Sequence, residues 1–572
     1  MPKLFTFFLA LVLAGCAGDF AVEESAEISA EKPILKTASQ IAEVSNKKCG
    51  DGFCDEVERE KEICPRDCVE VKIEITPKSA DPVRRAEAVA PIPQEVASTD
   101  AESSPFGAHP AGANNYEYAK DLGLSWNREG SYFSWIWSDP ARSGNFSFKK
   151  AVAPENPNLS KSGGVINYDN QRSRLNLAGI NTMVNVCPFH KGGEFRDAAE
   201  EQNYRQFVNK LVERYDGDDD LGCEQNYPDC YSPGDDEYPS AELIEKIAAS
   251  PIKYWQVCNQ LQDTCEDDCR DTFGEKFANA QKITYEAAKS ADPTASILIA
   301  GDSGIQEYEP VFRALNGEFI DIVDFHRFAP VGDHDPAPDF DRLKRDLEKN
   351  NFDTEKLRFW ITETGTFSDE PVDALRGRSF SSQSEKQQAG DLFKRNVAAL
   401  FYGIEKIFWA WGIDEGFHRD CGLFDYTGLI YDGCDCVDEK YICGSDADDD
   451  PGAGVKKLGY FTFKLLVEKL DGADWDAVEL VQNSDDIFIY KFVKNSAPIW
   501  VGWSDGDAER VATLEVGNRD SVKITAAIPT ADSGAALDEN NYPNFFASSV
   551  AASENGRVAI ILGESPIFIE TE

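Results

Sequence analysis

The chain is 572 residues long and carries 57 basic and 102 acidic side chains, so its formal net charge is −45. This charge repels nucleic acid backbones and anionic lipid headgroups, which argues against nucleic acid as a partner. The length predicts two or three compact units, and a composition that is 42% hydrophobic and 11% aromatic excludes disorder over most of the chain.

The first sixteen residues, MPKLFTFFLALVLAGC, have the order of an export signal. Lys3 precedes an apolar run from Leu4 to Leu13, and small residues follow. The letters LAGC, which end at Cys16, resemble the lipobox of prokaryotic lipoproteins, which implies cleavage before Cys16 and lipid attachment to its sulfur. An ordinary signal peptide is the alternative. We therefore expect an exported protein at the cell surface or envelope, in contact with the membrane through a lipid anchor only.

Three segments precede the main body of the chain. Residues 17–48 are polar and rich in alanine, which predicts a flexible tether. Residues 49–68 hold four cysteines among acidic side chains and cannot build an apolar core, so disulfides or a hard cation must hold them. This segment resembles small acidic Cys-rich modules of secreted microbial proteins, and a structural spacer is the favoured interpretation. Residues 69–105, rich in Pro, Ala and Ser, predict a second linker.

Disulfides are the default expectation for an exported chain whose fourteen cysteines besides Cys16 form an even set. Most of these cysteines are close together in the sequence. Cys187 and Cys258 instead lie within strand-like apolar runs, where they are either buried thiols or a long-range pair.

Between residues 106 and 470, short apolar runs alternate with amphipathic segments. This rhythm predicts a (β/α)₈ TIM barrel, in which parallel strands alternate with an outer ring of helices. The loops after the second, third, fourth and eighth strands carry the extra length. The strand candidates are FGAHP, SWNREG, NLAGINTMVNVCPFH, PIKYWQVCNQ, SILIAG, FIDIVDFHRF, LRFWITETG and EKIFWAWGID.

From residue 471 to 572 the pattern changes to short alternating runs separated by turn residues. These runs include IFIYKFVKN, APIWVGWSDG, ERVATLEVGN and RVAIILG. Helical patterning is nearly absent. The segment therefore predicts an antiparallel β-sandwich as an accessory domain.

Polar side chains follow several barrel strands, and the carboxyl ends of such strands converge on one mouth. The seventh strand ends in Thr362-Glu363-Thr364, and the eighth carries Trp409 and Trp411. A carboxylate beside tryptophan suits sugar chemistry, because the carboxylate can stabilise or attack an oxocarbenium-like carbon while the indole stacks on the ring. Four of the five histidines also follow barrel strands, namely His109, His190, His326 and His418.

In this order, FGAHP, YWQVCNQ, VDFHRF, FWITETG and FWAWG resemble successive strands of clan A glycoside hydrolases, which are retaining enzymes on a (β/α)₈ barrel. The resemblance covers residues 106–572. It implies Glu363 as the nucleophile, Asn259 as the residue that holds the sugar 2-hydroxyl, and His326 next to the nucleophile. It also implies that Arg128 orients Glu363 by charge-assisted hydrogen bonding. The remaining substrate-binding candidates are Trp409 or Trp411 as the floor of the sugar subsite, with His109 and His190.

In this family the residue after that asparagine is the acid/base glutamate, but here it is Gln260. An amide cannot transfer the catalytic proton, a step that contributes on the order of 10²–10⁴ in rate. One alternative is a substrate whose leaving group needs little protonation, as in plant myrosinases, which resemble this arrangement. A second is another proton donor. The donor candidates are Glu129, Asp263 and Glu266.

A third alternative is that hydrolysis has been lost and the barrel is a carbohydrate-binding or adhesion protein; a purely structural surface protein is a further rival. The intact motif around Glu363 favours retained chemistry. We therefore predict an exported O-glycosyl hydrolase that acts on a glycan or glycoside with a non-standard or missing acid/base.

No cofactor is expected, and no motif predicts a catalytic metal or a phosphate-binding loop. The acidic runs at 216–223 and 445–454 suggest calcium. Both fail the EF-hand pattern, because Leu221 and Pro451 stand where the turn glycine belongs. Solvated loops are favoured, with irregular calcium sites as the alternative.

Overall fold

The computed structural model describes part of the chain. The N-terminal signal with Cys16, the tether, the Cys-rich module at 49–68 and most of the second linker lie outside the described residues. Residues Ala97–Glu572 belong to one compact unit. The described residues are 102–571 except 112–115, 149–150, 153–164, 170–179, 190–192, 218–240, 250, 262–271, 329–331, 370–371, 374–377, 380, 416–420, 438–439, 444–450, 485 and 507.

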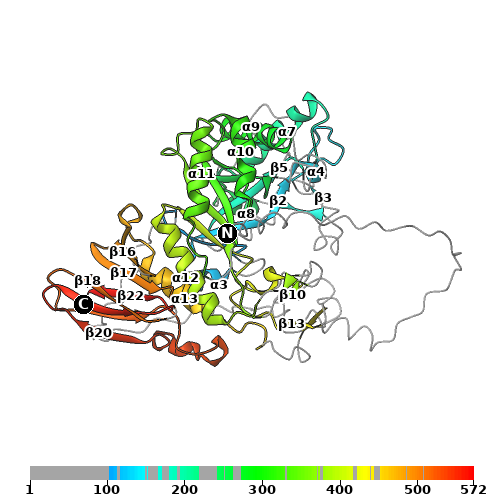
Figure 1. Ribbon diagram of the computed structural model, residues 1–572. Coiled ribbons are helices and arrows are strands. Elements are labelled where there is room, and N and C mark those ends of the chain that lie inside the picture. The colour runs from blue at the N-terminus through cyan, green and yellow to red at the C-terminus, as the bar shows by residue number, and fades with distance from the viewer. Residues whose placement is uncertain are drawn as a thin grey trace, which may run out of the picture. The chain divides into compact units, whose positions relative to one another are not determined.

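Within the described residues, eight parallel strands close into a barrel in the order β1-β12-β9-β8-β7-β6-β5-β2, which confirms the predicted TIM barrel. Seven of the predicted strand runs contain their strand, and the run SWNREG covers only the first part of β2, which continues to Ser134; β2 and β5 are labelled in Figure 1. The barrel strands are β1 (Phe106–His109), β2 (Trp126–Ser134), β5 (Asn181–Cys187), β6 (Tyr254–Val257), β7 (Ser296–Leu298), β8 (Ile322–Phe328), β9 (Arg358–Gly365) and β12 (Lys406–Ala410).

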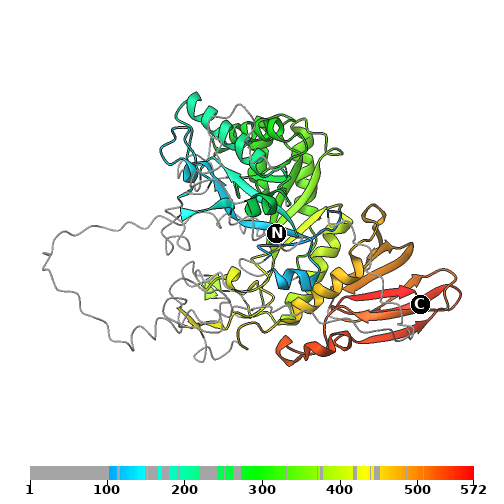
Figure 2. The same cartoon turned by 180° about the vertical axis from the view of Figure 1, so that it is seen from behind.

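Helices alternate with these strands, and Figure 1 and Figure 2 show α7, α9, α10 and α11 around the barrel. The start of α12 is explained by a capping box, in which Ser384 accepts from the backbone N–H of Gln387 and the Gln387 side chain bonds back. The helices are α3 (Glu117–Leu122), α4 (Trp135–Ser138), α7 (Ala198–Arg214), α8 (Ala241–Ala248), α9 (Phe273–Ala291), α10 (Tyr308–Leu315), α11 (Ala337–Lys349), α12 (Glu385–Phe401) and α13 (Leu458–Leu470).

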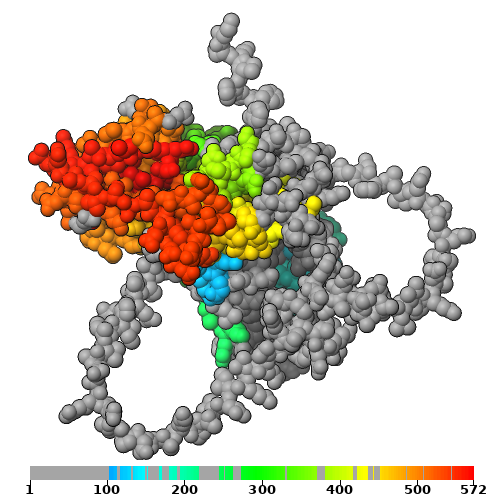
Figure 3. Space-filling view, turned by 90° about the horizontal axis from the view of Figure 1, so that it is seen from below, coloured from blue at the N-terminus to red at the C-terminus, as the bar shows by residue number. Residues whose placement is uncertain are grey.

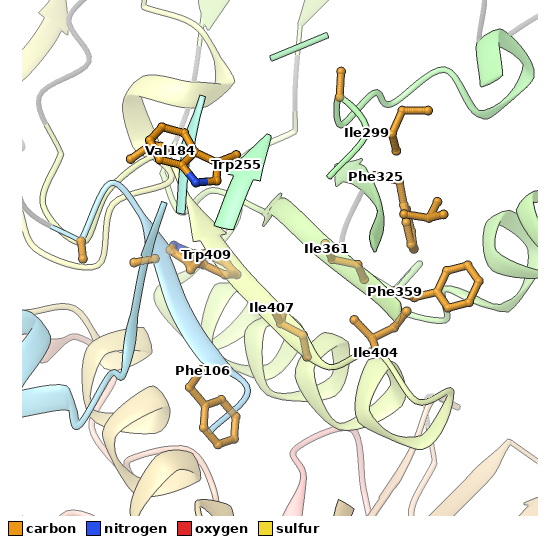
Figure 4. Close-up of a cluster of buried hydrophobic side chains, with 14 of the residues drawn as sticks. Phe106, Val184, Trp255, Ile299, Phe325, Phe359, Ile361, Ile404, Ile407 and Trp409 are labelled. Atoms are coloured by element: carbon orange, nitrogen blue, oxygen red, sulfur yellow. The ribbon is translucent and has the colours of Figure 1, made fainter. Parts of the chain in front are cut away.

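The outer face of the barrel strands is packed against the helices through one large apolar cluster. Figure 4 shows part of it, including Val184, Trp255, Phe325, Ile361 and Trp409. Because successive side chains of a strand point to opposite faces, the residues next to these face the barrel interior.

The barrel interior is built in layers. The lower layer is apolar and consists of Trp126, Met183, Tyr254, Leu298, Ile322, Trp360 and Phe408. Two residues further along each strand, toward its carboxyl end, the interior side chains change from apolar to polar on five strands. The polar layer consists of Arg128, Asn185, Gln256, Asp324 and Thr362. The apolar layer therefore closes the barrel from below and leaves the polar chemistry at the carboxyl end.

The C-terminal strands form antiparallel sheets, which confirms the predicted sandwich class. A six-stranded sheet has the order β15-β16-β17-β22-β19-β20, and β18 pairs with β21 in a second sheet. Side chains of both sheets share one core, which includes Trp500, Leu514 and Ile560. These strands form the red and orange surface in Figure 3. They are β15 (Glu479–Ser484), β16 (Ile487–Lys494), β17 (Ala497–Ser504), β18 (Arg510–Glu515), β19 (Ser521–Ala526), β20 (Ser548–Ala552), β21 (Arg557–Leu562) and β22 (Ile567–Thr571).

The barrel and the C-terminal sheets contact each other through α12. Phe393 packs edge to face on Phe568 of β22 at 5.2 Å between ring centroids. Lys394 Nζ donates to Asp505 Oδ1 at 2.8 Å. Among the described residues, none of the helices has the length and apolar run that a bilayer crossing requires.

Short elements complete the described part. The two-stranded sheets β3–β4, β10–β11 and β13–β14 lie outside the barrel, and a disulfide joins Cys434 to Cys443 across the last of them. Their bounds are β3 (Ala151–Val152), β4 (Val165–Ile166), β10 (Val372–Asp373), β11 (Arg378–Ser379), β13 (Cys434–Val437) and β14 (Lys440–Cys443).

Candidate active site

Glu363 lies near the carboxyl end of β9 and is 3% exposed. Its Oε1 accepts a hydrogen bond from Arg128 Nη1 at 2.5 Å. His109 Nε2 lies 3.5 Å from the same oxygen, and His326 Nδ1 lies 3.3 Å from Oε2. The carboxylate is thus held by Arg128 of β2, while the rings of His109 on β1 and His326 on β8 pack against it and limit its orientation.

The Arg128 guanidinium connects Glu363 with the end of β6. Arg128 is fully buried, and its Nη2 donates to Asn259 Oδ1 as well as to Gln256 Oε1 at 2.8 Å. Its Nε donates to the same Gln256 oxygen at 3.1 Å. The planar fork therefore places Glu363 and Asn259 next to each other, as the sequence resemblance implies.

The two histidines beside Glu363 are neutral near neutral pH. Burial, followed by the positive charge of Arg128, lowers the pKa of both His109 and His326 well below the usual value. His109 Nδ1 faces the backbone carbonyl oxygen of Arg128 at 3.0 Å, so this nitrogen carries the hydrogen. Likewise His326 must carry its hydrogen on Nδ1 to donate to Glu363. Both rings therefore orient their neighbours without adding a charge.

The His326 ring fits closely against Gly301, which follows β7. A Cβ atom at position 301 would lie 2.3 Å from His326 Nε2 and 2.8 Å from Thr362 Oγ1. Only glycine at position 301 leaves room for the His326 ring. The close approach explains why His326 reaches Glu363 from the neighbouring strand.

Beneath Glu363, the polar layer contains side chains that our sequence reasoning missed. Gln256 Oε1 accepts from Arg128 and from Asn185 Nδ2, while Gln256 Nε2 donates to Asp324 Oδ2. Thr362 Oγ1 donates to the same Asp324 oxygen at 2.8 Å. The sequence contains a pattern that could have identified these positions. Each of these residues comes two positions after an apolar residue of the same strand, and residues two apart on a strand face the same side.

Asp324 is fully buried, and this burial raises the pKa of its carboxyl to about 7. The folded protein therefore keeps a proton on Asp324, between about pH 4 and pH 7, that the unfolded chain releases. The contribution of this group to stability is complete below pH 4 and is lost as the pH rises toward 7.

We expect Asp324→Asn to abolish this pH dependence, because the amide does not ionise. The free energy of unfolding of the variant, minus that of the wild type, should rise by about 3 kcal/mol between pH 4.5 and pH 7. Urea unfolding at several pH values measures this difference, in which titration of other groups cancels. A difference that does not change with pH would contradict the expectation.

A disulfide joins Cys187, the last residue of β5, to Cys258, which directly precedes Asn259. Of the two alternatives from the sequence, the long-range pair is therefore correct. Cys258 has a left-handed backbone with φ of 59°, and its carbonyl oxygen accepts from Asn185 Nδ2 at 2.9 Å. These contacts fix the turn after β6 that carries Asn259 and the half-buried Gln260.

The two candidate tryptophans differ in environment. Trp409 is 1% exposed, belongs to the outer apolar cluster and donates its indole N–H to the Thr427 carbonyl at 2.9 Å. Trp411 is half-buried and lies against His109, with 4.6 Å between ring centroids. The peptide bonds that precede Pro110 and Trp411 are cis. Of the two, Trp411 is the residue that is partly exposed and whose ring contacts a residue of the site.

Of the remaining candidate residues from the sequence, the structure describes only Glu129. Glu129 follows Arg128 on β2 and is half-buried. His190, His418, Asp263 and Glu266 lie outside the described residues, as do most of the acidic runs considered for calcium. In the part of the chain that the structure describes, no group of three or more His, Cys, Asp or Glu side chains could hold a metal ion.

Solved structures with a similar fold include glycoside hydrolases. A family 39 glycoside hydrolase from the gut symbiont Bacteroides cellulosilyticus has a TM-score of 0.50 and 13% identity, with 82% of each chain covered. The α-L-arabinofuranosidase of Thermotoga maritima, in complex with arabinose, has a TM-score of 0.50 and 11% identity, with 80% of this chain and 89% of that chain covered. No protein-family model matches the chain, and no curated protein matches it. At these identities the likeness shows the fold alone, which is an eight-stranded parallel barrel.

Proposed function

We propose that this protein is a glycoside hydrolase that acts by a retaining mechanism with Glu363 as the nucleophile. The observation that carries the proposal is the position of Glu363, a buried carboxylate held by Arg128 with Asn259 on the same guanidinium. The half-exposed Trp411 offers a ring on which a sugar can stack. An exported, lipid-anchored chain, as the N-terminal sequence predicts, would meet a glycan or glycoside outside the cell.

In the first step, a Glu363 oxygen attacks the anomeric carbon, and the bond from this carbon to the leaving-group oxygen breaks with its electron pair on that oxygen. Gln260 cannot protonate this oxygen. The step is therefore expected to be fast only for leaving groups that are stable as anions. In the second step, a water oxygen bonds to the same carbon, the bond to the Glu363 oxygen breaks with its electron pair on that oxygen, and the water loses a proton to solvent; without a base this step is slow.

Two measurements test the proposal. The protein is incubated with aryl glycosides that bear good leaving groups, and mass spectrometry then searches for a glycosyl adduct on the Glu363 peptide. Azide is added in parallel, because this anion can attack the adduct without a base. We expect a burst of the released phenol, accumulation of the adduct, and faster turnover when azide is present. Sugars that bind without turnover and without an adduct would contradict the proposal.

The substitution Gln260→Glu should raise hydrolysis of substrates with poor leaving groups, because it adds a carboxyl where the family has its acid/base. We expect an increase on the order of 10²-fold for alkyl glycosides and little change for activated aryl glycosides. Gln260→Ala serves as the control, since it changes the side chain without adding a proton donor. No gain in a folded Gln260→Glu variant that still binds the sugar would show that residue 260 does not occupy the place of the donor.

A second candidate function is a carbohydrate-binding or adhesion protein on a barrel without hydrolytic activity. The observation that favours it is the amide at Gln260, half-buried directly after Asn259. The adduct experiment separates the two functions, because a binding protein retains the sugar without a covalent bond to Glu363. Absence of any sugar binding would leave the purely structural rival.

A further inference from the structure

The polar layer beneath Glu363 contains a carboxyl group, Asp324, that the proposed reaction does not use. It lies on β8, is fully buried and is linked to the site through one side chain, Gln256. We propose that Asp324 is a positioning residue for the nucleophile: it fixes the orientation of the Gln256 amide, and Gln256 in turn directs the Arg128 guanidinium toward Glu363. The catalytic part of this inference rests on the proposed function.

The Gln256 amide has two chemically opposite ends. Arg128 can only donate, and Asn185 offers Nδ2 as a donor, so the Gln256 oxygen must face these two side chains. Three donors converge on this single oxygen. If the amide turned over, its NH₂ group would face the guanidinium, so Arg128 Nε would lose its acceptor Gln256 Oε1 and Nη2 would keep only Asn259 Oδ1.

The other side of the amide reinforces the same orientation. There Asp324 Oδ2 accepts from Gln256 Nε2 and also from Thr362 Oγ1. A carboxyl oxygen prefers the NH₂ end of Gln256 to its carbonyl end, and the Thr362 hydroxyl holds that oxygen in place. We call the hydrogen-bonded chain Asp324–Gln256–Arg128 the relay. Since Thr362 directly precedes Glu363, its contact with Asp324 also connects the relay to the strand of the nucleophile.

Burying the Asp324 carboxyl costs free energy of folding, which indicates that this residue has a role other than stabilising the fold. Among the described residues, Asp324 Oδ1 has no hydrogen-bond partner. A buried carboxyl with one oxygen left without a partner is unfavourable, and an apolar side chain of similar size often costs less at such a place. Burial also raises the pKa of Asp324 to about 7, which is the expected sign of this cost. Fixing the direction of Arg128 is a benefit that an apolar side chain could not supply.

The test compares two substitutions at one position. Asp324→Leu removes the acceptor, whereas Asp324→Asn keeps an oxygen that can accept from Gln256 and Thr362. Gln256→Leu, which removes the middle of the relay, is a second variant with the same expectation as Asp324→Leu. The control is Asp169→Leu. Asp169 is equally buried and binds Arg214 at 2.7 Å, but it has no contact with the relay.

Each variant is crystallised and assayed with an activated aryl glycoside. In Asp324→Leu and Gln256→Leu we expect Arg128 Nη1 to leave hydrogen-bonding distance of Glu363. We expect kcat to fall about 10- to 100-fold, with KM changed much less. Asp324→Asn should retain the Arg128–Glu363 contact and lose at least five times less kcat than Asp324→Leu. The folded Asp169→Leu protein should keep its kcat, whatever its stability.

The proposal is overturned if the Arg128–Glu363 contact and kcat survive in both leucine variants, or if Asp324→Asn loses as much kcat as Asp324→Leu. Failure of the proposed function is a separate result. If the wild type forms no adduct and shows no turnover, the crystal structures still decide the relay: a displaced Arg128 in the leucine variants supports it, and an unmoved Arg128 refutes it.

Discussion

Replacing Glu363 with Gln should abolish the glycosyl adduct and lower turnover of activated aryl glycosides by more than about 10³-fold. The amide oxygen can still accept from Arg128 Nη1, so the geometry in which Glu363 is held at 2.5 Å is largely kept. An amide, however, is a poor nucleophile and carries no negative charge to stabilise an oxocarbenium-like carbon. The adduct is measured by mass spectrometry, and turnover is measured by release of the phenol.

Glu405 provides a matched control for this substitution. Its carboxylate also accepts from an arginine, Arg358, and from Trp360, but it is more exposed and lies just before β12, at the opposite end of that strand from Trp411. Glu405→Gln should leave turnover unchanged. A Glu363→Gln protein that keeps more than about a tenth of the wild-type turnover would exclude Glu363 as the nucleophile.

Replacing Arg128 with Met is expected to have the largest effect on stability. The substitution keeps the length of the side chain but leaves the buried Glu363 carboxylate without its counterion. It also removes the Arg128 hydrogen bond to Asn259 Oδ1 and two of the three donors that converge on Gln256 Oε1. Breaking a buried pair by removing one partner typically costs about 3–5 kcal/mol. We expect a loss of this size in the free energy of unfolding, measured with urea, together with loss of turnover.

The comparison with Arg214 separates the two effects. Arg214 is also nearly fully buried and pairs with Asp169 through two hydrogen bonds of 2.8 Å and 2.7 Å, away from Glu363. Arg214→Met should therefore lose a similar amount of stability while its folded fraction keeps turnover. If Arg128→Met is as stable as the wild type, the guanidinium is not the counterion of Glu363 in solution.

Much of the candidate site could be predicted from the sequence, because the barrel rhythm assigns strand ends to one mouth. The rhythm put Glu363, His109 and His326 at strand ends, while Asn259 and Arg128 were named because of the resemblance to clan A glycoside hydrolases. The structure brings all five into one hydrogen-bonded and contacting group. Their roles in catalysis remain predictions. The same rhythm failed at the edges of the C-terminal sheet, where β15 and β20 were not expected because their side chains are mostly exposed and polar or small.

The polar layer shows that the partners of buried polar side chains could not be predicted from the sequence, even where their positions could. Gln256 and Asp324 lie inside apolar runs, where a single polar residue has no preferred partner in the sequence. Their pairing depends on the strand register, which sets Asn185 opposite Gln256 and His326 opposite Glu363. Register is a property of the closed barrel, so it becomes visible only when all eight strands are in place.

By itself, the sequence determined the class of the fold and the side chains at the strand ends, because hydrophobic periodicity and strand order are local properties of the chain. The tertiary structure alone decided three further points. It joined Cys187 to Cys258 across 71 residues. It buried Trp409 in the outer cluster while leaving Trp411 beside His109. It also connected Asp324 to Glu363 through Gln256 and Arg128, since residues far apart in sequence interact only after the barrel has closed.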